Sequence, residues 1–219
     1  MSTTSHTIPS MGAVMAAEAA DHSKRKKATP DNWMYPPPGG WTYEQVKELV
    51  LPYDWELVDG AIVVRGMANQ WHDDVRDGLL VALRLAGRPP YRVNSERCVL
   101  VDEANPTKPD VVVFDSTNLD RLTMECVPVE RVVLAVEVVS QGSRTDDRFR
   151  KPGMYAQAGI ACFWRVERDE NDLPVVHEFW LHPETGVYAS NPDRPTHTGT
   201  LKTDVPFPVE IDLENLLRG

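Results

Sequence analysis

The chain has 219 residues, of which 42% are apolar and 26% charged, a composition typical of a globular domain with a buried core. Its 33 acidic and 23 basic side chains give a formal net charge of −10, which disfavours unspecific binding to a phosphate backbone unless basic residues gather locally. Neither a bilayer-crossing apolar run nor a signal peptide is evident, so we expect a cytoplasmic protein without a membrane partner.

Residues 1–40 predict a disordered amino-terminal arm, and residues 41–219 predict a single domain. The arm lacks a sustained apolar period, carries the basic run 24–27 and ends in the prolines and glycines of residues 36–40. The basic run is either a solvated tail or a contact for nucleic acid or another acidic partner. The remaining 179 residues hold 19 basic and 30 acidic side chains, so the arm does not carry the negative charge.

The first half of the domain predicts two helices and several strands. Thr42 is placed to cap a short helix, and Asp59-Gly60 favours a tight turn between strands at residues 55–58 and 61–64. Apolar residues recur at helical spacing over residues 72–86, just before a glycine and two prolines. Residues 91–101 then have β-like composition.

The second half predicts an α/β core closed by a hairpin. Apolar runs at residues 111–114 and 132–139 predict buried strands, and residues 146–158 predict a helix that ends at a glycine. A strand at 160–167 follows, with a hairpin formed by 175–180 and 186–189. The segment 191–200 is polar and predicts a surface loop.

The cysteines predict three buried thiols rather than a disulfide framework or a zinc site. Cys98, Cys126 and Cys162 are odd in number, widely spaced and never in a C-x-x-C pair. His177-Glu178 resembles the start of a zinc protease motif, but the next histidine, His182, is one residue too far along for a shared helix face. Phosphate-binding glycine motifs and a nucleophile elbow are also missing.

Two acidic residues suggest a metal site. Glu137 interrupts an apolar strand, where an unpaired charge costs several kcal/mol, and Asp110 opens the strand at 111–114. If these strands are neighbours, alternation allows the two carboxylates to meet, and such oxygen ligands suit Mg²⁺ or Mn²⁺. The alternatives are that Asp110 caps a turn after its proline and that Glu137 pairs with Arg131 or Arg148.

These residues resemble an ordered set of motifs in a known family. Pro109-Asp110, Glu137 within residues 134–140, and Lys151 and Tyr155 ahead of residues 158–164 resemble the Uma-type putative restriction endonuclease family of the PD-(D/E)XK nuclease superfamily. The resemblance spans roughly residues 41–190. It implies a restriction endonuclease-like fold, in which helices flank a mixed β-sheet and extra β-hairpins are added, together with a divalent metal and hydrolysis of DNA phosphodiesters.

The chain departs from the superfamily pattern at one position. Val139 stands where the lysine of the ExK element is usual, and the resemblance assigns that role to Lys151 on the following helix. Its ammonium group would orient the attacking water and stabilise charge on the phosphorane. Pro152 and Gly153 imply that the helix either bends at this point or begins at the proline. The alternative for Lys151 is a solvated surface lysine.

Supporting roles are predicted for two further residues. The resemblance places Glu56 near the site as a third acidic ligand or a partner of the ligands, the alternative being a solvated edge-strand carboxylate. His72 begins a helix and is a candidate for orienting water or contacting phosphate, although a helix-start histidine without such a role is as common. Asp146 and Asp147 are expected to cap the second helix.

Arg144 and Arg148 are the predicted DNA contacts, because they lie four apart after the strand that carries Glu137. The leading hypothesis is therefore a magnesium- or manganese-dependent endonuclease in which Asp110 and Glu137 bind metal and Lys151 assists catalysis. The alternative is a noncatalytic binding protein that keeps a nuclease-like core. A homodimer would suit cleavage of two strands.

Overall fold

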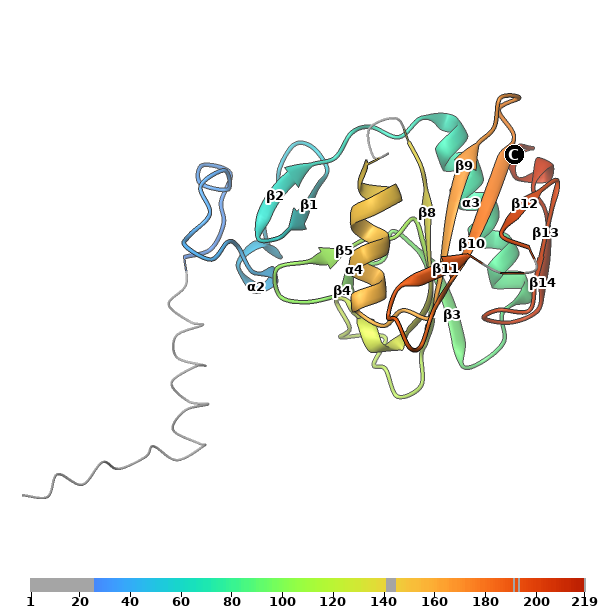
Figure 1. Ribbon diagram of the computed structural model, residues 1–219. Helices are drawn as coiled ribbons and strands as arrows, with labels where there is room; N and C mark the ends of the chain where they lie inside the picture. The colour runs from blue at the N-terminus through green and yellow to red at the C-terminus, as the bar shows by residue number, and fades with distance from the viewer. Residues whose placement is uncertain (1–25, 141–144, 191, 193, 219) are drawn as a thin grey trace, which may run out of the picture.

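A seven-stranded mixed β-sheet forms the centre of the molecule (Figure 1). The computed structural model describes residues 26–140, 145–190, 192 and 194–218. The order across the sheet is β11-β10-β9-β8-β6-β3, with β12 also paired to β10. The strands are β3 (Tyr91–Ser95), β6 (Val111–Asp115), β8 (Val132–Val138), β9 (Cys162–Arg168), β10 (Pro174–Leu181), β11 (Tyr188–Ser190) and β12 (Thr196–Thr198).

The strand pairings determine which residues meet at the ends of β6 and β8. These two strands are antiparallel, with Val111 opposite Val136. β8 and β9 are parallel, and the chain between them passes through η2 (Asp146–Arg150) and α4 (Lys151–Gln157). Because of this crossover, a helix lies next to the carboxyl end of β8, as expected for a β-α-β unit.

Each face of the sheet buries its own apolar cluster, because successive strand residues point to opposite sides. Helix α3 (Gln70–Ala86), the β13–β14 hairpin (Thr200–Thr203 and Val209–Asp212) and η3 (Glu214–Leu217) supply residues that pack on one face. Helix α4 packs on the other face together with residues of β4 and β7. These belong to a three-stranded sheet of β4 (Val99–Leu100), β5 (Pro106–Thr107) and β7 (Val127–Pro128), which η1 (Val129–Arg131) follows.

A third apolar cluster lies at the amino-terminal side of the described chain. It joins α2 (Tyr43–Val46) to the hairpin of β1 (Trp55–Val58) and β2 (Ala61–Val64), whose turn residues Asp59 and Gly60 both have positive φ. Residues 26–40, which the sequence assigns to the arm, contribute Ala28 and Trp33 to this cluster. Residues 1–25, which include Lys24 and Arg25 of the basic run, lie outside the described residues.

The cysteine prediction is wrong for two of the three residues. Cys98 and Cys126 form a disulfide, while Cys162 is a buried free thiol as expected. The parallel pairing of Val99 with Val127 places the two preceding cysteines side by side. Several strands were also missed: β12 lies within the segment 191–200 that was predicted as a loop, β13 and β14 follow it, and the two-residue strands β5 and β7 were not predicted either. No helix in the described part of the chain is long and apolar enough to span a membrane.

Candidate active site

Asp110 and Glu137 meet at the end of the β6–β8 pair, as the strand alternation predicts. Since Val111 is opposite Val136, the next pair along the antiparallel register is Asp110 and Glu137. The Val138 backbone N–H donates a 2.7 Å hydrogen bond to Asp110 Oδ2, which joins the aspartate directly to β8. Asp110 is 2% exposed and Glu137 is fully buried, so both carboxylates lie in the interior.

Lys151 and Tyr155 hold the Glu137 carboxylate from helix α4. The Lys151 Nζ atom lies 2.7 Å from Glu137 Oε2, and the Tyr155 hydroxyl donates a 2.6 Å hydrogen bond to Oε1. Lys151 also forms an ion pair with Asp147 Oδ1 at 3.0 Å, and the lysine side chain is 3% exposed. The alternatives considered from the sequence, a solvated Lys151 and a pairing of Glu137 with Arg131 or Arg148, therefore do not hold.

The spacing of these helical residues explains why they meet. Asp147, Lys151 and Tyr155 are four residues apart in succession, so they lie along one face of the helical segment. The segment begins with the π-helical turns of η2, where the Lys151 N–H donates to the Asp146 carbonyl five residues earlier. Pro152 follows at the start of α4, where its missing N–H is tolerated. Lys151 thus lies at the junction of two helical turns.

Asp147 is a member of the site that the sequence interpretation missed. It was expected to cap the helix, but it is 1% exposed and pairs with Lys151. The position of the aspartate four residues before Lys151 was the available signal, although such a residue near a helix start more often serves as a cap.

The site combines three carboxylates with few positive charges. Burial raises the pKa of Glu137 to about 8, and the neighbouring Asp147 and Asp110 add to this effect while Lys151 opposes it. Burial lowers the pKa of Lys151, but the attraction of Glu137 and Asp147 outweighs burial and leaves that pKa above its usual value. Lys151 is therefore a cation, and the cluster has an affinity for a further proton or cation.

His72 contacts Asp110, the other of the two predicted metal ligands. The His72 Nε2 atom lies 3.3 Å from Asp110 Oδ2, and Asn69 caps the helix by accepting the His72 backbone N–H at 3.0 Å. Burial lowers the pKa of His72, yet its contact with Asp110 leaves the pKa above the ordinary value. Burial raises the pKa of Asp110, but His72, Lys151 and the Val138 N–H together hold it below the ordinary value.

Glu56 lies on β1 and approaches the same cluster from the amino-terminal side. Its side chain is 11% exposed, and Oε1 lies 3.5 Å from Arg65 Nε. Burial lowers the pKa of Lys151, whereas Glu137 and Asp147 raise it. The Glu56 carboxylate also raises this pKa, by a smaller amount. The structure thus brings Glu56 close to the site rather than leaving it as a solvated edge residue.

Of the two arginines predicted to contact DNA, the structure describes only Arg148, which is engaged in an ion pair. Arg148 donates two hydrogen bonds to Glu167, and its side chain is 40% exposed. Arg144 lies outside the described residues.

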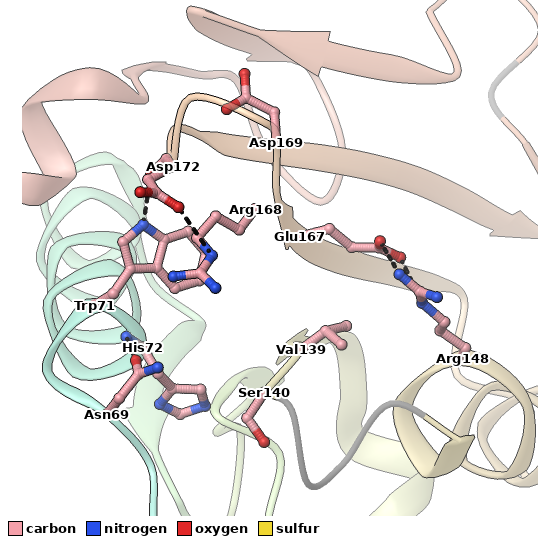
Figure 2. Close-up of a pocket in the computed structure, with 10 residues that line it drawn as sticks. All are labelled: Asn69, Trp71, His72, Val139, Ser140, Arg148, Glu167, Arg168, Asp169 and Asp172. Atoms are coloured by element: carbon pink, nitrogen blue, oxygen red, sulfur yellow. Dashed lines mark hydrogen bonds and ion pairs between the residues drawn. The ribbon is translucent and has the colours of Figure 1, made fainter.

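A pocket of about 240 Å³ lies between the start of α3 and the carboxyl ends of β8 and β9 (Figure 2). His72 lines this pocket on one side, and the Arg148–Glu167 ion pair lines it on another. Arg168 lies over the indole of Trp71, 5.8 Å from the ring centre. Through this pocket, His72, which contacts Asp110, lies next to solvent.

The donor set fits a divalent cation that keeps part of its water shell. Among the residues that the structure describes, neither Asp110 Oδ1 nor Glu56 Oε1 accepts a hydrogen bond, although both atoms are buried. No group of three or more His, Cys, Asp or Glu side chains in that part of the chain is already arranged around one ion position. Mg²⁺ commonly takes one or two protein carboxylates and completes its shell with water and phosphate oxygens. Asp110 and Glu137 match that requirement.

Comparison with known proteins identifies a family and a solved structure that resembles this chain. The Uma2 family model, described as a putative restriction endonuclease, matches residues 42–206. A crystal structure of a putative nuclease belonging to DUF820 from Anabaena variabilis superimposes with a TM-score of 0.58 and 14% sequence identity. The match covers 81% of this chain and 97% of the other, so the two proteins share a fold. A search of curated proteins finds no match.

Proposed function

Since the chain belongs to the Uma2 family of putative restriction endonucleases, we propose that it hydrolyses DNA phosphodiester bonds with the help of a divalent metal. The observation that carries the proposal is the pairing of Asp110 and Glu137 across β6 and β8, with Lys151 in contact with Glu137. Two carboxylates and one amine in a buried site are the groups that such a hydrolysis requires.

Asp110 and Glu137 would hold Mg²⁺ or Mn²⁺, with Glu56 close enough to support the same ion. When bound, the metal supplies a Lewis acid that offsets negative charge on the phosphoryl oxygens and makes water more acidic. Lys151 stabilises the negative charge that develops during attack on phosphorus. Tyr155 fixes the orientation of Glu137 through its 2.6 Å hydrogen bond, and Asp147 keeps Lys151 protonated beside it.

The test is cleavage of DNA by the full chain with Mg²⁺ or Mn²⁺, on both native and heat-denatured plasmid. Asp110→Asn and Glu137→Gln keep the side-chain size but remove the charge, and each is expected to lower the cleavage rate by about 100-fold or more. Glu210→Gln, on the exposed β13–β14 hairpin, is the matched control and should cleave normally. Cleavage that persists in both site variants would refute the proposal.

One observation favours a noncatalytic binding protein as the second candidate. Both Glu137 oxygens already accept hydrogen bonds from Tyr155 and Lys151, so the cluster is also stable as an ion-pair network. Titration calorimetry with Mn²⁺ separates the candidates. Heat of binding that disappears in Asp110→Asn supports the nuclease, whereas no binding at millimolar Mn²⁺ supports the binding protein.

A further inference from the structure

A second hollow, which we call the groove, has a volume of about 580 Å³. It runs along α2 and β1 and past the residues just before Asp110. Its polar, charged and aromatic lining residues include Tyr43, Lys47, Tyr53, Trp55, Glu56, Arg65, Glu96 and Lys108. A volume of this size is within the range that accommodates one small-molecule ligand or nucleotide.

Asp110, Glu137 and Lys151 do not themselves line the groove, but two residues that do, Glu56 and Arg65, interact electrostatically with them. The side-chain exposures of Glu56 and Arg65 are 11% and 26%. Burial lowers the pKa of Arg65, but the negative charges of Glu56, Asp110 and Glu137 outweigh this effect and leave that pKa above its usual value. The guanidinium therefore lies within the electric field of the cluster. Glu96, another lining residue, donates its backbone N–H to the carbonyls of Pro109 and Asp110.

The burial of the cluster restricts the substrate that can reach it. Glu137, Asp110 and Lys151 are 0%, 2% and 3% exposed, so a phosphodiester must enter a hollow to approach them. A duplex is a wide, stacked rod, and an enzyme that acts on a group within such a hollow must first separate or extrude the nucleotide. A single strand can enter without that cost.

The outer part of the groove has the chemistry of a single-strand binding surface. Tyr53 is 40% exposed, and its ring contacts Trp33 edge-on at a centroid distance of 6.0 Å. Lys108 is exposed, and no carboxylate of the described residues forms an ion pair with it. Lys47 supplies a second cation, shared with Glu44 and Glu125. Aromatic rings with cations along one path are typical of proteins that bind single strands without reading sequence.

The charged side chains that line the groove balance one another, whereas the molecule as a whole is negative. Three cations, Lys47, Arg65 and Lys108, line it together with the carboxylates of Asp54, Glu56 and Glu96. On a chain with a net charge of −10, this is a region where a phosphate backbone meets less repulsion.

We propose that this groove binds single-stranded DNA, with a base stacked on Tyr53 and phosphates beside Lys108 and Lys47, and guides the strand to Asp110 and Glu137. The inference rests on the proposed nuclease function for its last step, the entry to the cluster. Its binding step stands on the groove alone.

The experiment measures binding of fluorescein-labelled DNA of about 12 nucleotides to the full chain in EDTA, by fluorescence anisotropy. The same sequence is presented as single-stranded DNA, duplex DNA and single-stranded RNA. The variants Tyr53→Ala and Lys108→Gln remove the stacking surface and the unpaired cation. Tyr35→Ala and Lys202→Gln are matched controls, because both residues are exposed and lie outside the groove. Circular dichroism verifies that all variants are folded.

We expect single-stranded DNA to bind more tightly than the duplex, and each groove variant to weaken that binding by about 5-fold or more while the controls bind normally. Tighter binding of the duplex or of RNA, or unchanged affinity in both groove variants, would overturn the inference. Cleavage with Mn²⁺ is measured separately. If the protein binds the strand through the groove but does not cut it, the groove inference stands and the nuclease proposal is rejected. If the protein cuts duplex DNA and the groove variants do not affect this cleavage, the nuclease proposal stands and the groove inference is rejected.

Discussion

At the scale of single residues, the site is a buried charge network in which each member depends on another. Lys151 is the cation between Glu137 and Asp147, while His72 and the Val138 N–H satisfy Asp110. Removing one partner of such a network leaves a buried charge uncompensated, which costs more than the pair itself contributes. The same arrangement that stabilises the native chain therefore sets the charge available for the proposed hydrolysis.

Above pH about 8, where Glu137 is ionised, Lys151→Met should destabilise the protein by about 3–5 kcal/mol, because Glu137 and Asp147 lose their common partner in the interior. Urea unfolding followed by circular dichroism measures the change. Lys202→Met is the matched control, since Lys202 pairs with Glu210 on the exposed surface and such pairs contribute little. Mn²⁺ is expected to restore part of the lost stability in Lys151→Met by supplying positive charge. A loss no larger than that of the control would contradict the buried network.

The raised pKa of Glu137 predicts how stability depends on pH without metal. The folded protein holds a proton on this carboxyl up to pH about 8, whereas the unfolded chain releases it near 4.5. Between these values the native state binds more protons, so the contribution of Glu137 to stability falls as pH rises and levels off above about 8.

Thermal unfolding in EDTA from pH 5 to pH 9 tests this direction. Glu137→Gln removes the titrating group, so its stability should fall less steeply over the same range. Mn²⁺ should protect the wild-type protein more at pH 8.5 than at pH 6, because binding needs the deprotonated carboxylate. Parallel pH profiles of the wild type and Glu137→Gln would show that this group does not titrate in the range.

At the scale of elements, the strands and helices with clear periodicity could be predicted and those defined by distant pairing could not. The β1–β2 hairpin followed from Asp59-Gly60, and the opposition of Asp110 and Glu137 followed from strand alternation once β6 and β8 were neighbours. The short strands β12 to β14 were missed, because each is only three or four residues long and is defined by pairing with β10 or with one another, although Val209 to Asp212 in β14 do alternate apolar and acidic residues.

The disulfide illustrates the same limit. Cys98 and Cys126 are 28 residues apart and become neighbours through the parallel β4–β7 pair, which consists of two residues on each strand. So short a parallel pair has no sequence signature, and an odd number of cysteines misleads the simple count.

Thiol titration with Ellman's reagent tests this bond. Unfolded in denaturant without reductant, the chain should present one thiol, that of Cys162, and three after reduction. The native protein should react slowly, because burial raises the pKa of Cys162 to about 12. Three thiols in the unreduced, denatured chain would contradict the disulfide.

The contact between residues 26–40 and the β1–β2 hairpin depends on two glycines. A Cβ atom on Gly60 would lie 2.8 Å from the Gly40 Cα, and Gly60 has a φ of +73°. Gly60→Ala should therefore cost more than about 1 kcal/mol and expose residues 26–40 to trypsin, which limited proteolysis detects. Gly66→Ala is the control, because open space surrounds that position and its φ is not positive. Equal digestion of the two variants would count against this contact.

At the scale of the whole molecule, the placement of charge matters more than its total. The chain carries −10, and Arg148, one of the cations expected to contact DNA, is paired with Glu167. The sequence could identify Asp110 and Glu137, the carboxylates proposed to bind metal, because one precedes an apolar strand and the other interrupts one. It could not locate the groove, since Lys47, Arg65 and Lys108 come from segments that only the fold brings together.

This charge distribution predicts a shallow salt dependence for binding of single-stranded DNA. Each phosphate neutralised on a single strand contributes about −0.7 to the slope of log affinity against log salt, so the two cations proposed to contact phosphates, Lys47 and Lys108, predict a slope of about −1.4. Anisotropy titrations over a series of salt concentrations measure it, and Lys108→Gln should make the slope shallower by about 0.7. A slope of about −5 or steeper would mean that a broad basic surface outside the groove neutralises the backbone, which the net negative charge of the domain argues against.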